Sequence, residues 1–129
     1  MNASVLQKQW LDGERMLPRF HEIGDVTLDL FHRDGRVEDR WLNLFPREFE
    51  LFWRLAEQPG QAVSKRQLLH DVWRMGYEPE GNRIAVHIAR LRSKLEPFGL
   101  IRLIGTHPDG GYYLDAPAGP SAFRFDSAR

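Results

Sequence analysis

The side chains best suited to binding a polyanion are concentrated between residues 82 and 104. This segment holds five basic residues and one acidic residue, whereas the whole chain has 18 of each and a formal net charge of zero. The charged residues are Arg83, Arg90, Arg92, Lys94 and Arg102, against Glu96. Because phosphate groups respond to the local field, a neutral protein can still present a basic face. The charge distribution therefore indicates a candidate nucleic-acid-binding surface.

The same segment has the apolar spacing of a helix with one buried face. Its apolar residues are separated by four, three and four positions, which follows the helical period. They are Ile84, Ile88, Leu91 and Leu95. Pro97 and Gly99 come next, and both residue types favour the end of a helix. We therefore predict a helix from about Asn82 to Leu95.

A second stripe on this helix consists of Arg83, Val86, Arg90 and Lys94, with Arg92 on its flank. Such a stripe can lie in a DNA major groove, where arginine donors match the guanine edge and valine contacts a thymine methyl. The competing interpretation is an ordinary solvated helix face. Glutamate partners four residues away, which are typical of such a face, are missing here. Their absence favours the groove.

A second candidate anion site precedes another apolar run. Ser64 and Gln67 have the spacing of a capping box, in which each side chain satisfies a backbone donor of the other residue. Lys65 and Arg66 add two cations at the positive end of the helix dipole. A plain capping box with exposed cations is an equally good interpretation. Either way, a short helix that ends near Trp73 is predicted.

Catalytic and metal-binding patterns are absent from the sequence. There is no cysteine, and the five histidines lack metal-ligand spacing. HExxH, glycine-rich phosphate-loop and GxSxG motifs are also missing. His87 lies between two helix faces and is interpreted as structural, whereas His107 lies in a turn where it can touch DNA or simply form the turn. We therefore expect no cofactor, no metal and no enzymatic activity.

The elements that must position these residues form an α+β pattern. Short apolar runs between residues 20 and 44 predict an antiparallel sheet of three or four strands, with a hairpin turn at Asp34-Gly35. Helical periodicity begins at Pro46 and ends at Pro59-Gly60. After the third helix, the chain alternates through 101–104, turns, and returns through 112–114, which predicts a terminal hairpin.

The length of 129 residues favours one domain. We expect a folded domain over 20–116 and a tail over 117–129. Residues 1–19 are interpreted either as an arm that docks on the domain or as a short amphipathic helix. The sequence has no signal-peptide pattern and no apolar run of membrane-spanning length. A cytoplasmic protein without a membrane partner, associated with the nucleoid when bound, is therefore expected.

Three consecutive segments resemble one known family. FPREFELFWRLAEQPGQAVSKRQLLHDVW, GNRIAVHIARLRSKLEPFGLIRLI and GGYYL are similar in type and order to the OmpR/PhoB-type winged helix effector domain, over roughly residues 20 to 114. The resemblance implies a winged helix-turn-helix fold with an N-terminal antiparallel sheet, three helices and a C-terminal β-hairpin wing. It also implies that the third helix enters the major groove of double-stranded DNA.

The resemblance implies roles for particular residues. Those expected at or near base edges are Asn82, Arg83, Val86 and Arg90. Those expected to face phosphates are Ser64, Lys65, Trp73, Arg92 and Lys94. The remaining candidates for DNA contact are Arg66, His107 and Tyr112. The loop 74–81 matches a segment that can contact RNA polymerase in this family.

Three departures from the family pattern alter these expectations. Ala85 and Ala89 stand where the family usually has an acidic and a basic residue, and the wing turn around His107 lacks the usual arginine. In addition, 129 residues leave no room for a receiver domain, so phosphorylation in cis is not expected to regulate this chain. The leading hypothesis is a sequence-specific regulator that is a monomer in solution or a dimer on DNA. The alternative is a protein-interaction module for RNA polymerase or another regulator, with weak or non-specific DNA binding.

Overall fold

A computed structural model describes residues 9–12, 15–76 and 81–116, with side chains from Leu17 onward. Within them, β1 (Gln9–Asp12) and β2 (Arg15–Pro18) form an antiparallel hairpin in which Trp10 pairs with Leu17. The alternative of a short helix before residue 20 is therefore wrong for this part of the chain. The tail over 117–129 lies outside the described residues.

A four-stranded antiparallel sheet follows, in the order β3 (Phe20–Ile23), β4 (Val26–Asp29), β5 (Asp34–Val37) and β6 (Arg40–Trp41). The predicted sheet is confirmed. The alternation of buried and less buried residues along β3 and β5 places one face of the sheet against the core. Gly24, with a φ of 59°, supplies the left-handed residue in the turn between β3 and β4.

The hairpin turn predicted at Asp34-Gly35 lies elsewhere. The chain reverses over residues 30–33, and Asp34 and Gly35 are already in β5. A side chain at position 35 would approach Leu42 to 3.0 Å and Leu28 to 3.1 Å. Gly35 therefore leaves the room into which Leu42 and Leu28 pack inside the sheet, which the turn signal of an Asp-Gly pair does not reveal.

The three predicted helices are present as α2 (Pro46–Ala56), α3 (Lys65–Trp73) and α4 (Arg83–Leu95). Two short 3₁₀ turns, η1 (Glu96–Phe98) and η2 (Ile101–Leu103), follow α4. The terminal hairpin consists of β7 (Ile104–Thr106) and β8 (Tyr112–Leu114). The sequence predicts a strand over 101–104, but the strand begins only at Ile104, because the 3₁₀ turn η2 occupies residues 101–103.

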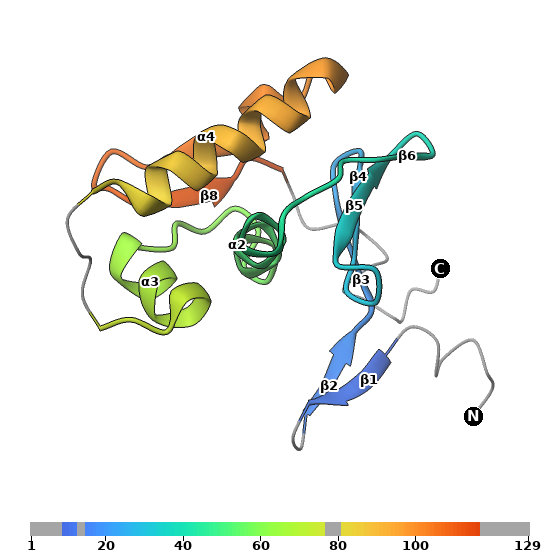
Figure 1. The fold of residues 1–129 in the computed structure, drawn as a ribbon, viewed down its shortest axis with the longest axis horizontal. Helices are drawn as coiled ribbons and strands as arrows, with labels where there is room; N and C mark the ends of the chain where they lie inside the picture. The colour runs from blue at the N-terminus through green and yellow to red at the C-terminus, as the bar shows by residue number, and fades with distance from the viewer. Residues whose placement is uncertain (1–8, 13–14, 77–80, 117–129) are drawn as a thin grey trace.

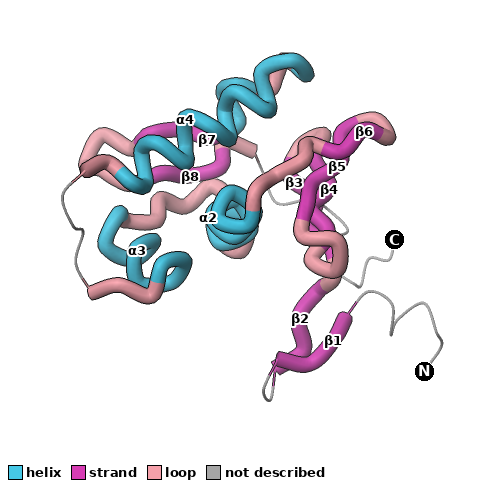
Figure 2. The backbone as a smooth tube through the Cα atoms, in the orientation of Figure 1, coloured by secondary structure: helices cyan, strands magenta, loops and turns pink. Residues whose placement is uncertain are grey.

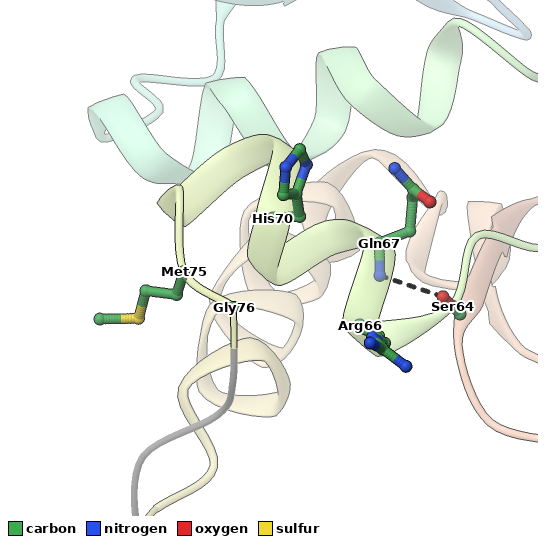
Figure 3. Close-up of a pocket in the computed structure, with 6 residues that line it drawn as sticks. All are labelled: Ser64, Arg66, Gln67, His70, Met75 and Gly76. Atoms are coloured by element: carbon green, nitrogen blue, oxygen red, sulfur yellow. Dashed lines mark hydrogen bonds between the residues drawn. The ribbon is translucent and has the colours of Figure 1, made fainter.

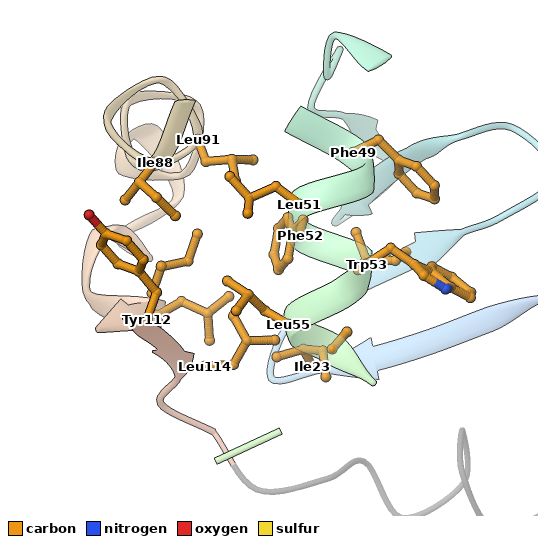
Figure 4. Packing of buried hydrophobic residues seen from close by; sticks show 14 of the residues in the cluster. Ile23, Phe49, Leu51, Phe52, Trp53, Leu55, Ile88, Leu91, Tyr112 and Leu114 are labelled. Carbon is orange, nitrogen blue, oxygen red and sulfur yellow. The ribbon is translucent and has the colours of Figure 1, made fainter. Parts of the chain in front are cut away.

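Helix α2 is the centre of the packing (Figures 1 and 2), because it lies between the sheet and the pair formed by α4 and the terminal hairpin, with contacts to α3 as well. In Figure 4, Phe49 and Trp53 point toward the sheet, whereas Leu51 and Leu55 extend toward α4 and β8. The predicted apolar face of α4 is confirmed, since its four apolar residues are at most 1% exposed. One hydrophobic core therefore runs from Ile23 to Leu114.

Candidate nucleic-acid interface

The outer face of α4 presents short side chains and one long cation. Val86 is 43% exposed, and Ala85, Ala89, Arg90 and Ser93 are exposed beside it. Arg90 has the only long charged side chain among these exposed residues of α4. A helix with this surface can approach another macromolecule closely, with one guanidinium available for directional hydrogen bonds.

The first turn of α4 is supported by α3. His87 Nδ1 lies 2.8 Å from the Arg83 carbonyl oxygen, to which it donates, and its ring packs edge-on against Trp73 at 5.1 Å between centroids. Trp73 and Arg83 are half-buried, whereas Asn82, the residue before the helix, is exposed. The structural interpretation of His87 agrees with this geometry, because the ring joins two helices.

The N-terminus of α3 carries an exposed cationic pair. Ser64 Oγ accepts a hydrogen bond from the Gln67 backbone N–H at 3.0 Å, and Lys65 and Arg66 are exposed beside it. Figure 3 shows this cap at one end of a pocket lined by Ser64, Arg66, Gln67, His70, Met75 and Gly76. The exposed donors and cations of this turn suit an anion such as a phosphate.

Only half of the predicted capping box forms. The Gln67 side chain donates to Asp71 Oδ2 at 2.9 Å, where Arg54 Nε also donates at 2.8 Å, instead of returning to Ser64. Burial alone would raise the pKa of the Asp71 carboxyl, but hydrogen bonds from His70, Arg54 and Gln67 outweigh it and lower the pKa to about 2. Gln67 therefore helps to join α3 to α2.

Lys94 departs from its expected outward position. Its Nζ lies 2.5 Å from Oε1 of Glu48, which is fully buried, and 2.9 Å from the carbonyl oxygen of Asn43. The ammonium group also lies 4.0 Å from the centre of the Phe45 ring. The physical reason is the buried carboxylate, because a charge removed from water requires a close counter-charge. Lys94 thus joins the end of α4 to the start of α2.

Arg92 also departs from its expected outward position. Its guanidinium donates to the Ile104 carbonyl oxygen from Nε at 3.0 Å and from Nη2 at 2.7 Å. Nη2 lies 2.9 Å from the Thr106 hydroxyl as well, and the group sits 5.9 Å from the centre of the Tyr112 ring. The guanidinium is therefore directed at the terminal hairpin, where a strand carbonyl provides the acceptor.

The terminal hairpin buries one of its predicted contact residues and exposes part of another. Tyr112 is 6% exposed and packs next to Ile88 (Figure 4), so its ring belongs to the core and not to an outer surface. His107 is half-buried in the turn, where its Nδ1 accepts from the Asp109 N–H at 3.1 Å. Gly111 lies so close to Val63 that any side chain would meet its carbonyl oxygen at 2.5 Å.

The structure thus brings together part of the predicted set. The N-terminus of α3 and the outer face of α4 both expose cations, while Arg92, Lys94 and Tyr112 contact other parts of the domain. Residues 77–80 of the loop 74–81 lie outside the described residues, and Arg74 before them is exposed in the left-handed conformation at a φ of 59°. Sequence reasoning missed Glu48, although its place three residues after the helix boundary at Phe45 signals a capping carboxylate.

Over residues 9–12, 15–76 and 81–116, no group of three or more potential ligands could hold a metal ion. No helix in those ranges is long and apolar enough to cross a membrane.

An antiparallel sheet, three helices and a terminal hairpin packed on the third helix together define a winged helix-turn-helix domain. The family described as transcriptional regulatory protein, C terminal, matches residues 38–114. The chain belongs to this family, whose effector domains are of the OmpR/PhoB type.

Relatives of known structure and curated function agree with this assignment. The DNA-binding domain of Klebsiella pneumoniae RstA, solved in complex with RstA box, is 26% identical with a TM-score of 0.66, over 74% of this chain and 96% of that one. The DNA-binding domain of CpxR from E. coli is 27% identical with a TM-score of 0.64, over 74% and 94% of the two chains. The heme response regulator HssR of Staphylococcus aureus is 30% identical over 72% of this chain, which spans only 42% of that relative.

Proposed function

We propose that the domain binds double-stranded DNA sequence-specifically as part of a transcriptional regulator, with α4 in the major groove. The observation that carries this proposal is the exposed row of α4 in which Val86 and Arg90 stand one turn apart. An arginine fork matches the guanine O6 and N7 atoms, and an apolar side chain fits a thymine methyl. Family membership and the DNA-binding neighbours support the same function.

The proposed contacts divide into three groups. The base-edge group consists of Asn82, Arg83, Val86 and Arg90. The phosphate group consists of Ser64, Lys65 and Arg66, with Trp73 at its margin. His107 in the wing turn is proposed to lie near the flanking backbone. We also propose that the chain is a monomer in solution and pairs on DNA, which the mass of the free and DNA-bound species in sedimentation would test.

The decisive test of the base-reading role is Arg90→Ala. A duplex selected by the wild-type chain from a random-sequence library would serve as ligand, with fluorescence anisotropy as readout. Loss of a bidentate base contact is expected to weaken binding by about 1–3 kcal/mol and to relax the preference at one base pair. Arg36→Ala, which removes an exposed arginine from the sheet, is the matched control and should leave affinity unchanged. Equal affinities for wild type and Arg90→Ala on every duplex would refute the proposed helix placement.

A second candidate function is a protein-interaction module that uses the loop 74–81 to bind RNA polymerase or another regulator. The exposed alanines at positions 85 and 89 favour it, because they leave the outer face of α4 poor in polar groups. The two functions separate in a pull-down with purified RNA polymerase combined with salt-titrated DNA binding. Capture of polymerase together with only sequence-independent DNA affinity would support the second function over the first.

A further inference from the structure

We propose that Arg92 is a positioning residue that holds the wing, residues 104–114, against α4 and does not contact DNA phosphate. The expected effect on DNA affinity rests on the proposed function, whereas the contact between Arg92 and the wing is a property of the free domain. Phosphate contact is the role that the sequence resemblance implies for Arg92. The contacts of its guanidinium group favour the positioning role instead.

The first argument is the geometry of the guanidinium. Nε and Nη2 both donate to the carbonyl oxygen of Ile104, at 3.0 and 2.7 Å, and Nη2 also donates to Thr106 Oγ1 at 2.9 Å. A turn of Arg92 toward a phosphate would break all three hydrogen bonds. A planar fork held at this many points is preorganised in one orientation.

The second argument is that the wing needs this support. β7 and β8 have three residues each, and an isolated two-stranded hairpin of that length is at best marginally stable in water. On its α3 side, the wing is held by reciprocal backbone hydrogen bonds between Val63 and Tyr112, at 2.8 and 3.0 Å. On its α4 side, the Tyr112 ring packs next to Ile88, and Arg92 adds side-chain donors to the strand β7.

The third argument is the consequence for the interface. Arg92 lies two residues after Arg90, so one turn of α4 carries both the proposed base reader and the connection to the wing. The hydrogen bonds that fix the distance between α4 and the wing turn therefore lie close to the proposed base contact. The wing turn offers His107 and Asp109 but no lysine or arginine, so its position and not its charge must determine what it adds to binding.

The test compares Arg92→Ala, Arg92→Lys and Thr106→Val in the full chain. In the free protein, hydrogen exchange of the Gly105 and Tyr113 amides, which face each other in the wing, is expected to accelerate about tenfold in Arg92→Ala, because the lost hydrogen bonds stabilise the closed wing. Amides of α3 should keep their wild-type rates. Unchanged exchange in the wing would overturn the proposal, whether or not the chain binds DNA.

The DNA arm of the test uses the duplex selected by the wild-type chain. The positioning role predicts that Arg92→Ala and Arg92→Lys weaken binding to a similar extent, because lysine lacks the planar fork. It also predicts an unchanged slope of log K against log salt concentration. A phosphate contact predicts the opposite: near-normal binding by Arg92→Lys and a slope smaller by about 0.9 in Arg92→Ala.

A double-mutant cycle between Arg92→Ala and Thr106→Val completes the test. Because both changes remove the same contact, their effects on wing exchange should be clearly non-additive. Additive effects would overturn the assignment of Thr106 as a partner of Arg92. If the proposed DNA function failed, the wild-type chain would show no sequence-specific binding, but the exchange results in the free protein would be unaffected. The two failures are therefore distinguishable.

Discussion

Asp29 illustrates how a single buried polar residue organises its surroundings. Its carboxylate accepts hydrogen bonds from Arg19 Nε at 3.1 Å and from the backbone N–H of Phe31 at 2.9 Å, and it lies 2.8 Å from His32 Nδ1. Burial alone would raise its pKa, but the hydrogen bonds from Arg19 and His32 outweigh burial and place the pKa below the ordinary 3.8. One side chain thus shapes the turn between β4 and β5.

His21 is the residue that should give this domain its pH dependence in mild acid. It is 3% exposed, and burial lowers the pKa of its imidazole from 6.5 to about 4. Between these values the unfolded chain binds a proton that the folded chain does not, so the free energy of unfolding falls as the pH falls. The expected loss from pH 7 to pH 4 is about 3 kcal/mol.

Urea denaturation followed by tryptophan fluorescence at several pH values measures this loss. His21→Phe, which keeps a ring to pack against Trp53, should remove most of the dependence between pH 6.5 and 4. Asp29 and Asp71 do not interfere in this range, because their carboxyl pKa values lie below 3.8 and their contributions to stability are lost only in stronger acid. An identical pH profile for His21→Phe would assign the dependence to other groups.

At the scale of elements, α4 is connected to its neighbours along its whole length. Its N-terminal half contacts α3 through the Trp73–His87 ring pair, and its last turn reaches both the wing, through Arg92, and α2, through Lys94. Just beyond the helix, Arg40 of β6 lies 5.1 Å from the centre of the Phe98 ring. The orientation of the proposed recognition helix is therefore fixed by side chains from α2, α3 and β7, with the Arg40 contact just beyond its end.

The Lys94–Glu48 pair should be strongly asymmetric in its response to mutation. Lys94→Ala leaves the fully buried Glu48 carboxylate without its cation and is expected to destabilise the domain by about 2–4 kcal/mol. This cost is below that of breaking a completely buried pair, because the Lys94 side chain is 25% exposed. The pair of changes Glu48→Gln and Lys94→Met removes both charges and should recover most of this loss. Chemical denaturation of the three proteins measures both effects.

Arg36→Ala provides the comparison for this experiment, because its exposed ion pair with Asp39 is expected to contribute little. If Lys94→Ala proved as mild as Arg36→Ala, the buried pair would not be the connection that stabilises the end of α4.

At the scale of the whole molecule, the distribution of charge decides how strongly salt should affect binding. Of the cations on the proposed interface, Lys65, Arg66 and Arg90 are exposed and Arg83 is half-buried, whereas Arg92 and Lys94 are engaged within the domain. Neutral formal charge overall adds no long-range attraction to a polyanion. Binding should therefore depend on a few local phosphate contacts.

The expected slope of log K against log salt concentration is about −2 per domain, from roughly two phosphates neutralised by Lys65 and Arg66. Titration of the selected duplex between low and moderate salt, by fluorescence anisotropy, measures it. Lys65→Ala should reduce the steepness by about one unit on every sequence. A slope near −4 would instead mean that Arg92 and Lys94 leave their partners and bind phosphate in the complex.

Local patterns in the sequence were sufficient for the helices and for the buried face of α4. Ile84, Ile88, Leu91 and Leu95 recur at the period of a helix, and Ser64 is a strong N-cap, so both features depend on residues within a few positions. The family assignment also follows from the order of the motifs. In each case, the information lies in neighbouring residues.

The tertiary structure alone decided which cations remain available. Lys94 finds its carboxylate 46 residues earlier in the chain, and Arg92 finds its carbonyl acceptor 12 residues later, on elements that meet only after folding. The same holds for Gly35, which serves packing against Leu42 and Leu28 where an Asp-Gly pair suggests a turn. The helical period predicts on which face of α4 a long side chain begins. The partners of that side chain depend on which groups the fold places within its reach.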